Sequence, residues 1–227
     1  MNFLTICKRV VQEAGISGGG PTTVLNQTGQ LRKAVDWTVQ AWIDIQLSRP
    51  SWLFMNKQFT FNTVIGTRDY LAADYSITDM KLWDTGSFLI YETAIGTSDE
   101  GGLAFLPYGK WRDRYRAQMT ARPNDRPQLF TVLTDNRVRF EPSPSKIFTI
   151  SGDYKRSTQT FTADADVPTN LPEDFHMIIV WAALKYYAFY ENAPEVLEAA
   201  ERAYDGLLHR LEIEQLPEMD LDFRALA

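Results

Sequence analysis

The chain is poor in the residues from which most catalytic and metal centres are built. Its 227 residues include one cysteine, Cys7, and two histidines, His176 and His209. One cysteine excludes an intrachain disulfide and any site built from several cysteines. The two histidines do not have the spacing of a zinc motif. We therefore expect no metal, no cofactor and no enzymatic activity, and we expect Cys7 to be a buried thiol.

Long apolar runs and phosphate-binding loops are also missing. The most apolar run, 177–184, ends at Lys185 and is too short to cross a bilayer. The glycines at 18–20 are not followed by the Lys-Ser/Thr pair of a phosphate loop. Residues 15–19 (GISGG) match the letters of the GxSxG motif, but they follow a predicted helix and no strand precedes them, so they do not indicate a nucleophile elbow. Lys8 and Arg9 lie inside the first apolar pattern and not before it, so we expect no signal peptide and no membrane partner.

Aromatic residues, by contrast, are abundant, and charge is unevenly distributed. Phe, Trp and Tyr make up 13% of the chain, and large aromatic side chains favour interfaces as well as cores. The net charge is −6. Residues 1–170 hold 19 basic against 17 acidic residues, whereas residues 171–227 hold 4 against 12. An acidic C-terminal quarter on a near-neutral body is not typical of a freestanding nucleic-acid-binding protein.

Helical periodicity dominates both ends of the chain. A short helix follows Asn2, a second runs over 28–48, a third over 175–190 and a fourth from Pro194. The apolar arc of the second helix is too wide for one neighbour, and the third helix is apolar on every side except at Lys185. These two helices therefore need more neighbours than one chain supplies, and we expect other copies of the chain to cover the rest.

The middle third has the period of β-strands instead. Strands are predicted at 57–63, 87–91 and 147–156, with a hairpin that turns at Asp135-Asn136. A short amphipathic helix interrupts them near Trp111. The sequence thus predicts an α+β protein in which both chain ends form a helical bundle, 1–56 plus 166–214. A β-rich domain, 57–165, is inserted between them, and a tail, 215–227, follows.

Two segments carry the strongest charge or partner signals. Basic residues concentrate on the short helix, above all Arg112, Arg114 and Arg116; they would suit either a channel for a polyanion or a contact between subunits. The tail alternates acidic residues with large apolar ones, a pattern typical of segments that gain structure on a partner. A pair of carboxylates such as Glu92 and Glu100 would be needed for glycosidase chemistry, but nothing singles that pair out.

Taken in order, several segments resemble those of phage head-to-tail adaptor proteins. The likeness covers essentially the whole chain and rests on the order of segments, since none of them is a catalytic motif. The segments are 2–18, 23–46, 49–55, 59–70 (FTFNTVIGTRDY), 106–115 (LPYGKWRDRY) and 171–200.

The resemblance implies a structural role in the virion, at the junction of portal and tail, after assembly in the host cytoplasm. Such adaptors form a ring, usually twelvefold, that docks on the capsid portal, extends the DNA channel without reading its sequence, and gives the tail or nozzle a platform. On this basis we expect Leu221, Phe223 and Arg224 to contact the portal. We expect subunit contacts at Trp37, Trp42, Trp181 and Tyr187, and channel or subunit contacts at the three arginines.

Two alternatives remain open at this point. One is a tail-side stopper or tube component that never touches the portal. The other is a tail-associated glycosidase that cleaves peptidoglycan. A third possibility, weaker than these, is a β domain that recognises a host glycan.

Overall fold

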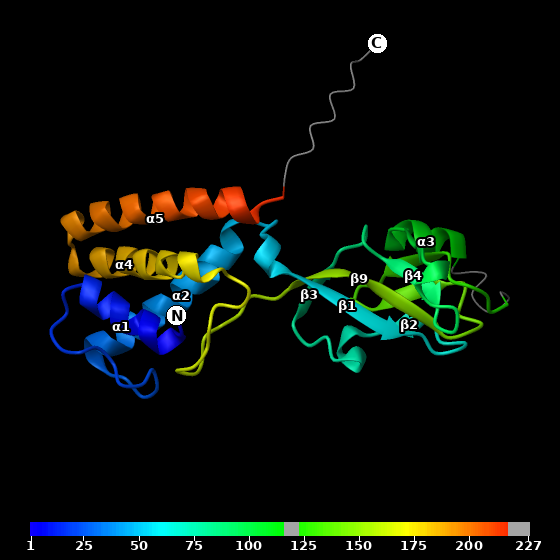
Figure 1. Ribbon diagram of the computed structural model, residues 1–227, viewed down its shortest axis with the longest axis horizontal. Helices are drawn as coiled ribbons and strands as arrows, with labels where there is room; N and C mark the ends of the chain where they lie inside the picture. Colours follow the sequence, from blue (N-terminus) through cyan, green and yellow to red (C-terminus); the bar gives the residue numbers. More distant parts are fainter. Residues whose placement is uncertain (116–122, 218–227) are drawn as a thin grey trace, which may run out of the picture. The chain divides into compact units, whose positions relative to one another are not determined.

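The computed structural model describes residues 1–115 and 123–217 (Figure 1). The described residues form a mixed α+β fold with helices at both ends of the chain and two β-sheets. The chain divides into two compact units. We call residues 1–55 together with those from 158 onward the helical unit, and residues 56–157 the β unit.

Four long helices make up most of the helical unit. Asn2 begins the first as expected, because its side-chain oxygen accepts a hydrogen bond from the backbone nitrogen of Thr5 at 2.9 Å. Asn192 adopts a left-handed conformation that ends the third, and Pro194 begins the fourth. The elements are α1 (Phe3–Glu13), α2 (Gly29–Ser48), α4 (Met177–Glu191) and α5 (Pro194–Gln215), with the 3-10 turns η1 (Leu53–Met55) and η5 (Glu173–Phe175).

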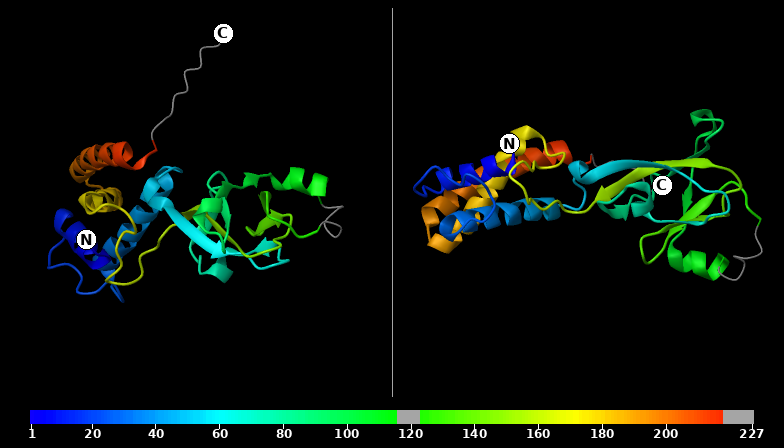
Figure 2. Two further views of the ribbon diagram at one scale, coloured as in Figure 1. Left: turned by 45° about the vertical axis from the view of Figure 1, so that its right-hand side comes forward. Right: turned by 90° about the horizontal axis from the view of Figure 1, so that it is seen from below.

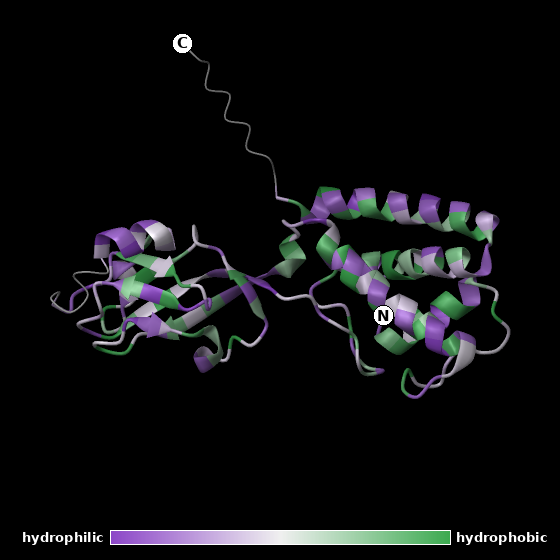
Figure 3. Cartoon of the chain, turned by 180° about the vertical axis from the view of Figure 1, so that it is seen from behind, coloured by the Kyte–Doolittle hydropathy of each residue, from purple (hydrophilic) through white to green (hydrophobic). Residues whose placement is uncertain are grey.

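Helix α4 has neighbours on three sides. It packs against α1, α2 and α5, and the views in Figures 1 and 2 agree on this arrangement. Helix α5 alternates between hydrophilic and hydrophobic residues along its length (Figure 3), as an amphipathic helix at the edge of a unit does. Much of the covering surface that α4 needs is therefore supplied by its own chain.

The segment that returns from the β unit packs on α2. The backbone nitrogen of Gln159 donates to Oε1 of Gln46 at 2.8 Å, and the Phe161 ring stacks on Trp42 with centroids 5.9 Å apart. The helical unit accordingly starts again at Thr158. Residues 158–165 were expected in the β domain, but they belong to the helical unit, and Phe161 is part of its core.

The β unit contains two sheets. In the first, the long strand β9 (Phe148–Arg156) pairs antiparallel with β1 (Asn56–Asn62) along one side and with β4 (Leu89–Glu92) and β3 (Met80–Trp83) along the other. Strand β5 (Gly101–Gly102) follows β4. The second sheet has the order β2 (Asp69–Tyr70), β8 (Val138–Glu141), β7 (Leu129–Val132) and β6 (Ala104–Phe105), and its last pair is parallel.

Aromatic side chains fill the core of the β unit. Phe59 and Phe61 alternate inward along β1, and Phe130 of β7 stacks on Phe88 with centroids 4.1 Å apart. The predicted hairpin is confirmed, since β7 and β8 pair across a turn in which Asn136 has φ of 63°. Strand β3 was not predicted. The short helix is α3 (Tyr108–Tyr115), which buries Trp111 and Tyr115.

Candidate functional site

Aromatic side chains gather at the surface of the helical unit where α2 and α4 meet, with Tyr190 exposed and Trp37 and Tyr187 partly buried. Trp37 of α2 lies 6.0 Å from Tyr187 and 5.7 Å from Tyr190 of α4, measured between ring centroids. The Lys33 ammonium lies 3.2 Å from the centre of the Tyr190 ring, a cation–π contact. We call Trp37, Tyr187 and Tyr190 the aromatic patch. Its composition is that of residues that dominate binding energy at protein interfaces.

Of the other two expected interface tryptophans, one is fully buried and one is partly buried. Trp42 is fully buried in its own chain, where it stacks on Phe54 and Phe161 and donates from Nε1 to Gln159. Its indole therefore has no surface to offer a second copy. Trp181 is partly buried and packs against the same core. Of the four positions, Trp37 and Tyr187 belong to the aromatic patch.

The last turn of α4 is not enclosed by the described part of the chain. Phe189 is 71% exposed and Tyr190 is 55% exposed. The sequence placed both in an apolar helix but did not single them out, because an all-apolar pattern does not say which turn has a neighbour. Their position just before Asn192, which ends the helix, was the one sequence feature that could have indicated exposure, because the last turn of a helix has fewer neighbours.

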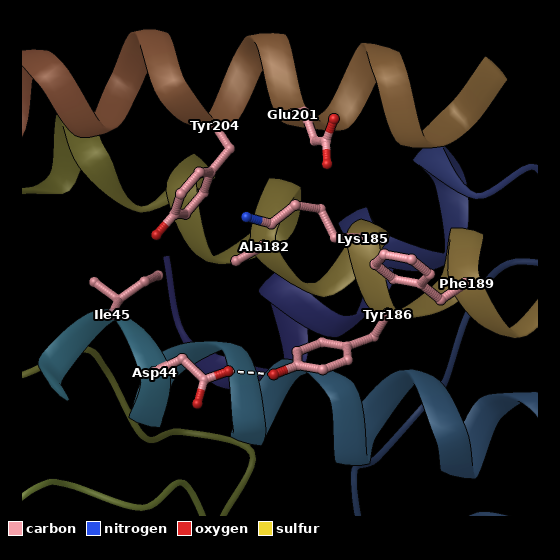
Figure 4. A pocket seen from close by; sticks show the side chains of 8 residues that line it. All are labelled: Asp44, Ile45, Ala182, Lys185, Tyr186, Phe189, Glu201 and Tyr204. Carbon is pink, nitrogen blue, oxygen red and sulfur yellow. Dashed lines mark hydrogen bonds between the residues drawn. The ribbon is translucent and has the colours of Figure 1, made fainter. Parts of the chain in front are cut away.

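Beside Phe189 runs a groove of about 280 Å³ between α2, α4 and α5 (Figure 4). The Tyr186 hydroxyl donates a hydrogen bond to Asp44 across it. Burial, and then this bond to a carboxylate, raise the pKa of Tyr186 to about 12. Lys185 lies 3.6 Å from the centre of the Tyr204 ring. The groove thus joins an apolar opening to fixed polar side chains, which suits binding a protein surface better than proton transfer near neutral pH.

The residues with nucleophilic or metal-binding chemistry do not come together. Cys7 is fully buried, and burial raises its thiol pKa to about 12. His176 is buried with its pKa lowered by desolvation, and its Nε2 lies 3.2 Å from the Leu171 carbonyl oxygen. His209 is exposed on α5. Among the described residues, no group of three or more His, Cys, Asp or Glu side chains is arranged to hold a metal ion.

The basic helix of the β unit presents its cations to solvent. Lys110, Arg112 and Arg114 are exposed on α3. The opposite, apolar side of this helix is buried through Trp111 and Tyr115. Arg112 forms an ion pair with the neighbouring Asp113 at 3.4 Å, and exposed pairs of this kind contribute little free energy. Arg116 lies outside the described residues. The helix therefore offers two described arginines to an anionic partner.

The expected portal contacts, Leu221, Phe223 and Arg224, also lie outside the described residues. Helix α5 carries the chain as far as Gln215, and Leu216 follows in extended conformation. No helix in the described part of the chain combines the length and the apolar character that a bilayer crossing requires.

Comparison with known proteins gives one family. A family model described as "SU10 adaptor protein" matches residues 1–222. No curated protein matches the chain.

Proposed function

Because the chain belongs to the SU10 adaptor protein family, we propose that it acts as a ring of identical copies that docks on the capsid portal. In this role the ring extends the DNA channel and provides the platform on which the tail or nozzle assembles. The protein then resides in the virion at the portal–tail junction and acts without catalysis. The four long helices serve as a bundle that packs side by side with its neighbours around the ring.

The observation that carries the proposal is the exposed aromatic surface of the helical unit. The aromatic patch and Phe189 lie on a chain that otherwise builds a complete core around α4. Exposed Phe and Tyr side chains that gather beside a partly buried Trp in this way mark interaction sites. In a closed ring each such contact is repeated between every pair of neighbours, so a modest interface becomes strong once the ring closes.

The tail and the basic helix supply the other two parts of the role. We propose that Leu221, Phe223 and Arg224 contact the portal, since alternating acidic and apolar residues suit docking on a partner. Arg112 and Arg114, together with Arg116, are proposed to face either the channel or a neighbouring copy. One copy has too few cations to hold DNA, whereas a ring of copies concentrates them around the passing genome.

The direct test is co-sedimentation of the full chain with purified portal particles from the same phage. A chain that ends at Leu216 lacks the three proposed contact residues and should lose binding. A full-length chain in which Phe223 and Leu221 are replaced by Ala controls for loss of the remaining tail and should also bind weakly. Undiminished binding by the truncated chain would remove the tail from the proposal, and imaging of whole particles would then decide between portal and tail-side positions.

A further inference from the structure

The helical unit has a protruding aromatic side chain on one flank and a hollow on another. Phe189 is more exposed than any other aromatic side chain in the described part of the chain, and it borders the groove shown in Figure 4. The hollow has a volume of about 230 Å³. Phe3, Val24 and Phe161, all buried, line it, and the rim includes Leu25, which is 56% exposed. The hollow also has polar residues in its lining, but its apolar floor can take a group of the size of a phenyl ring.

Helix α2 shows that these two features face in opposite directions. Asp44 and Ile45 of α2 line the groove beside Phe189, whereas Val35, Asp36 and Val39 line the hollow. At about 100° per residue, these two sets of positions point roughly 180° apart around the helix axis. One copy therefore cannot place its own Phe189 in its own hollow, but a second copy set beside it can.

We propose that Phe189 of one copy inserts into the hollow of the next, so that the two flanks form the contact between copies. This inference rests on the proposed function and names the surfaces that a ring would use. A protrusion on one flank and a hollow on the opposite flank give a heterologous contact. Contacts of this type repeat in one direction and produce rings or open filaments, not closed pairs.

Charge agrees with a second copy as the occupant. Glu201 borders the groove on the Phe189 flank, and Arg32 lines the hollow. Arg32 is in an exposed ion pair with Asp36 and can turn towards an incoming carboxylate, since such pairs are weak. One aromatic side chain buries about 150–250 Å², well below the roughly 800 Å² per partner of a stable interface. The contact is therefore weak in an isolated pair and gains its strength from repetition.

Cysteine crosslinking tests the pairing of flanks. The full-length variants Glu201→Cys, on the groove beside Phe189, and Leu25→Cys, on the rim of the hollow, each add one exposed thiol and keep the Phe189 ring. The native Cys7 is buried with its pKa raised to about 12 and stays unreactive. After mild oxidation of concentrated protein, the mixture of the two variants should give several-fold more disulfide dimer than either variant alone. A double variant should give a ladder of higher oligomers, because each copy then has both ends of the contact.

A matched control keeps exposure constant. Ile213 on α5 is 73% exposed and lines neither the groove nor the hollow. Ile213→Cys mixed with Leu25→Cys should give only background dimer. Sedimentation supplies a second readout, in which Phe189→Glu should abolish concentration-dependent association and Ile213→Glu should leave it unchanged.

Three results would overturn the inference. They are equal crosslinking in the mixture and in the single variants, dominant dimerisation of Glu201→Cys with itself, and a wild-type chain that does not associate at any concentration. None of these depends on the portal. If the truncated chain still binds portal while crosslinking fails, docking stands and this interface does not.

Discussion

The indole nitrogen of Trp42 donates a hydrogen bond of 3.1 Å to the side-chain oxygen of Gln159, which lies 117 positions later in the chain. The same oxygen accepts from the backbone nitrogen of Thr169 at 2.9 Å. Trp42 also stacks on Phe161. The fully buried Trp42 side chain thus anchors the segment that leads from the β unit to α4, through Gln159 and Phe161. Helix α4 in turn carries the exposed Phe189 and Tyr190.

Replacing Trp42 by Ala should therefore destabilise the helical unit strongly. The change removes a buried ring and a buried hydrogen-bond donor, and substitutions of this size cost about 3–5 kcal/mol. Urea unfolding followed by circular dichroism measures the loss. Trp37→Ala is the control, because that ring is only partly buried, and it should cost much less free energy. Equal costs for the two variants would contradict the account of Trp42 as the anchor.

The elements that sequence reasoning found are those whose pattern is local. The hairpin at Asp135-Asn136 follows from turn chemistry, and the first helix from the cap at Asn2. Strand β3 was missed because its four residues do not alternate between buried and exposed, and it exists by pairing with the end of β9 beyond β4. Register with a distant strand is not visible in four residues of sequence.

The candidate surface was only partly predictable, because its exposure depends on contacts between distant segments as well as on local pattern. Periodicity shows that α4 must be covered, but it does not say which turns its own chain covers. Trp42 and Trp37 lie on one helix, yet Phe54 and the returning Phe161 cover the first, which is fully buried, while the second is only partly buried. Phe189 stays exposed. Such differences depend on contacts between segments more than 100 residues apart, so they emerge only in three dimensions.

Gly152 should tolerate no side chain, because β9 presses it against β1. A Cβ atom at this position would lie 3.0 and 3.1 Å from two atoms of the Phe59 ring and 3.1 Å from the Ser87 hydroxyl. Phe59 is packed among Trp83 and Phe88 and has little room to move. Gly152→Ala should therefore cost about 1–3 kcal/mol, as overpacking does.

The control for this substitution is Gly102→Ala in the same sheet. Its Cβ would meet nothing within 4 Å, so the free energy of unfolding should change little. Thermal unfolding monitored by near-ultraviolet circular dichroism reports both variants, because the aromatic core of the β unit gives the signal. Should the two variants melt together, the close approach at Gly152 is not a constraint on packing.

Asp166 should give the helical unit a pH-dependent share of its stability. The backbone nitrogens of Ala163 and Thr162 donate to its carboxylate at 2.8 and 2.6 Å and hold its pKa below the usual value. A lowered pKa in the folded state means that the stabilisation is present above the unfolded pKa of about 4. It is lost as the pH falls through the lower, folded value.

The variant Asp166→Ala should accordingly be less stable than the native chain by about 1 kcal/mol at pH 7, and the difference should shrink as the pH drops below about 4. Urea unfolding across this pH range measures it. The neighbouring Asp164 is a useful comparison because its carboxylate accepts from the Val24 nitrogen at 2.6 Å, whereas the carboxylate of Asp166 accepts from its own loop. A difference at Asp166 that does not vary with pH would show that the lost bonds do not depend on its charge.

The exposed cations of α3 should govern contact with DNA if this helix faces a channel. Changing Arg112 and Arg114 to Glu removes two sites for phosphate contact. Because each phosphate contact contributes about 0.9 to the dependence of log K on log salt, the slope for binding of the assembled ring to a labelled duplex should fall by roughly 2 for each copy that contacts the duplex. Fluorescence anisotropy at a series of salt concentrations measures this slope. The control variant replaces Arg202 and Arg210 of α5 by Glu. It changes the net charge of −6 by the same amount as the α3 variant does, but it leaves α3 intact. If both double variants lose the same slope, total charge and not the face of α3 determines binding; if neither does, α3 is better explained as a contact between copies.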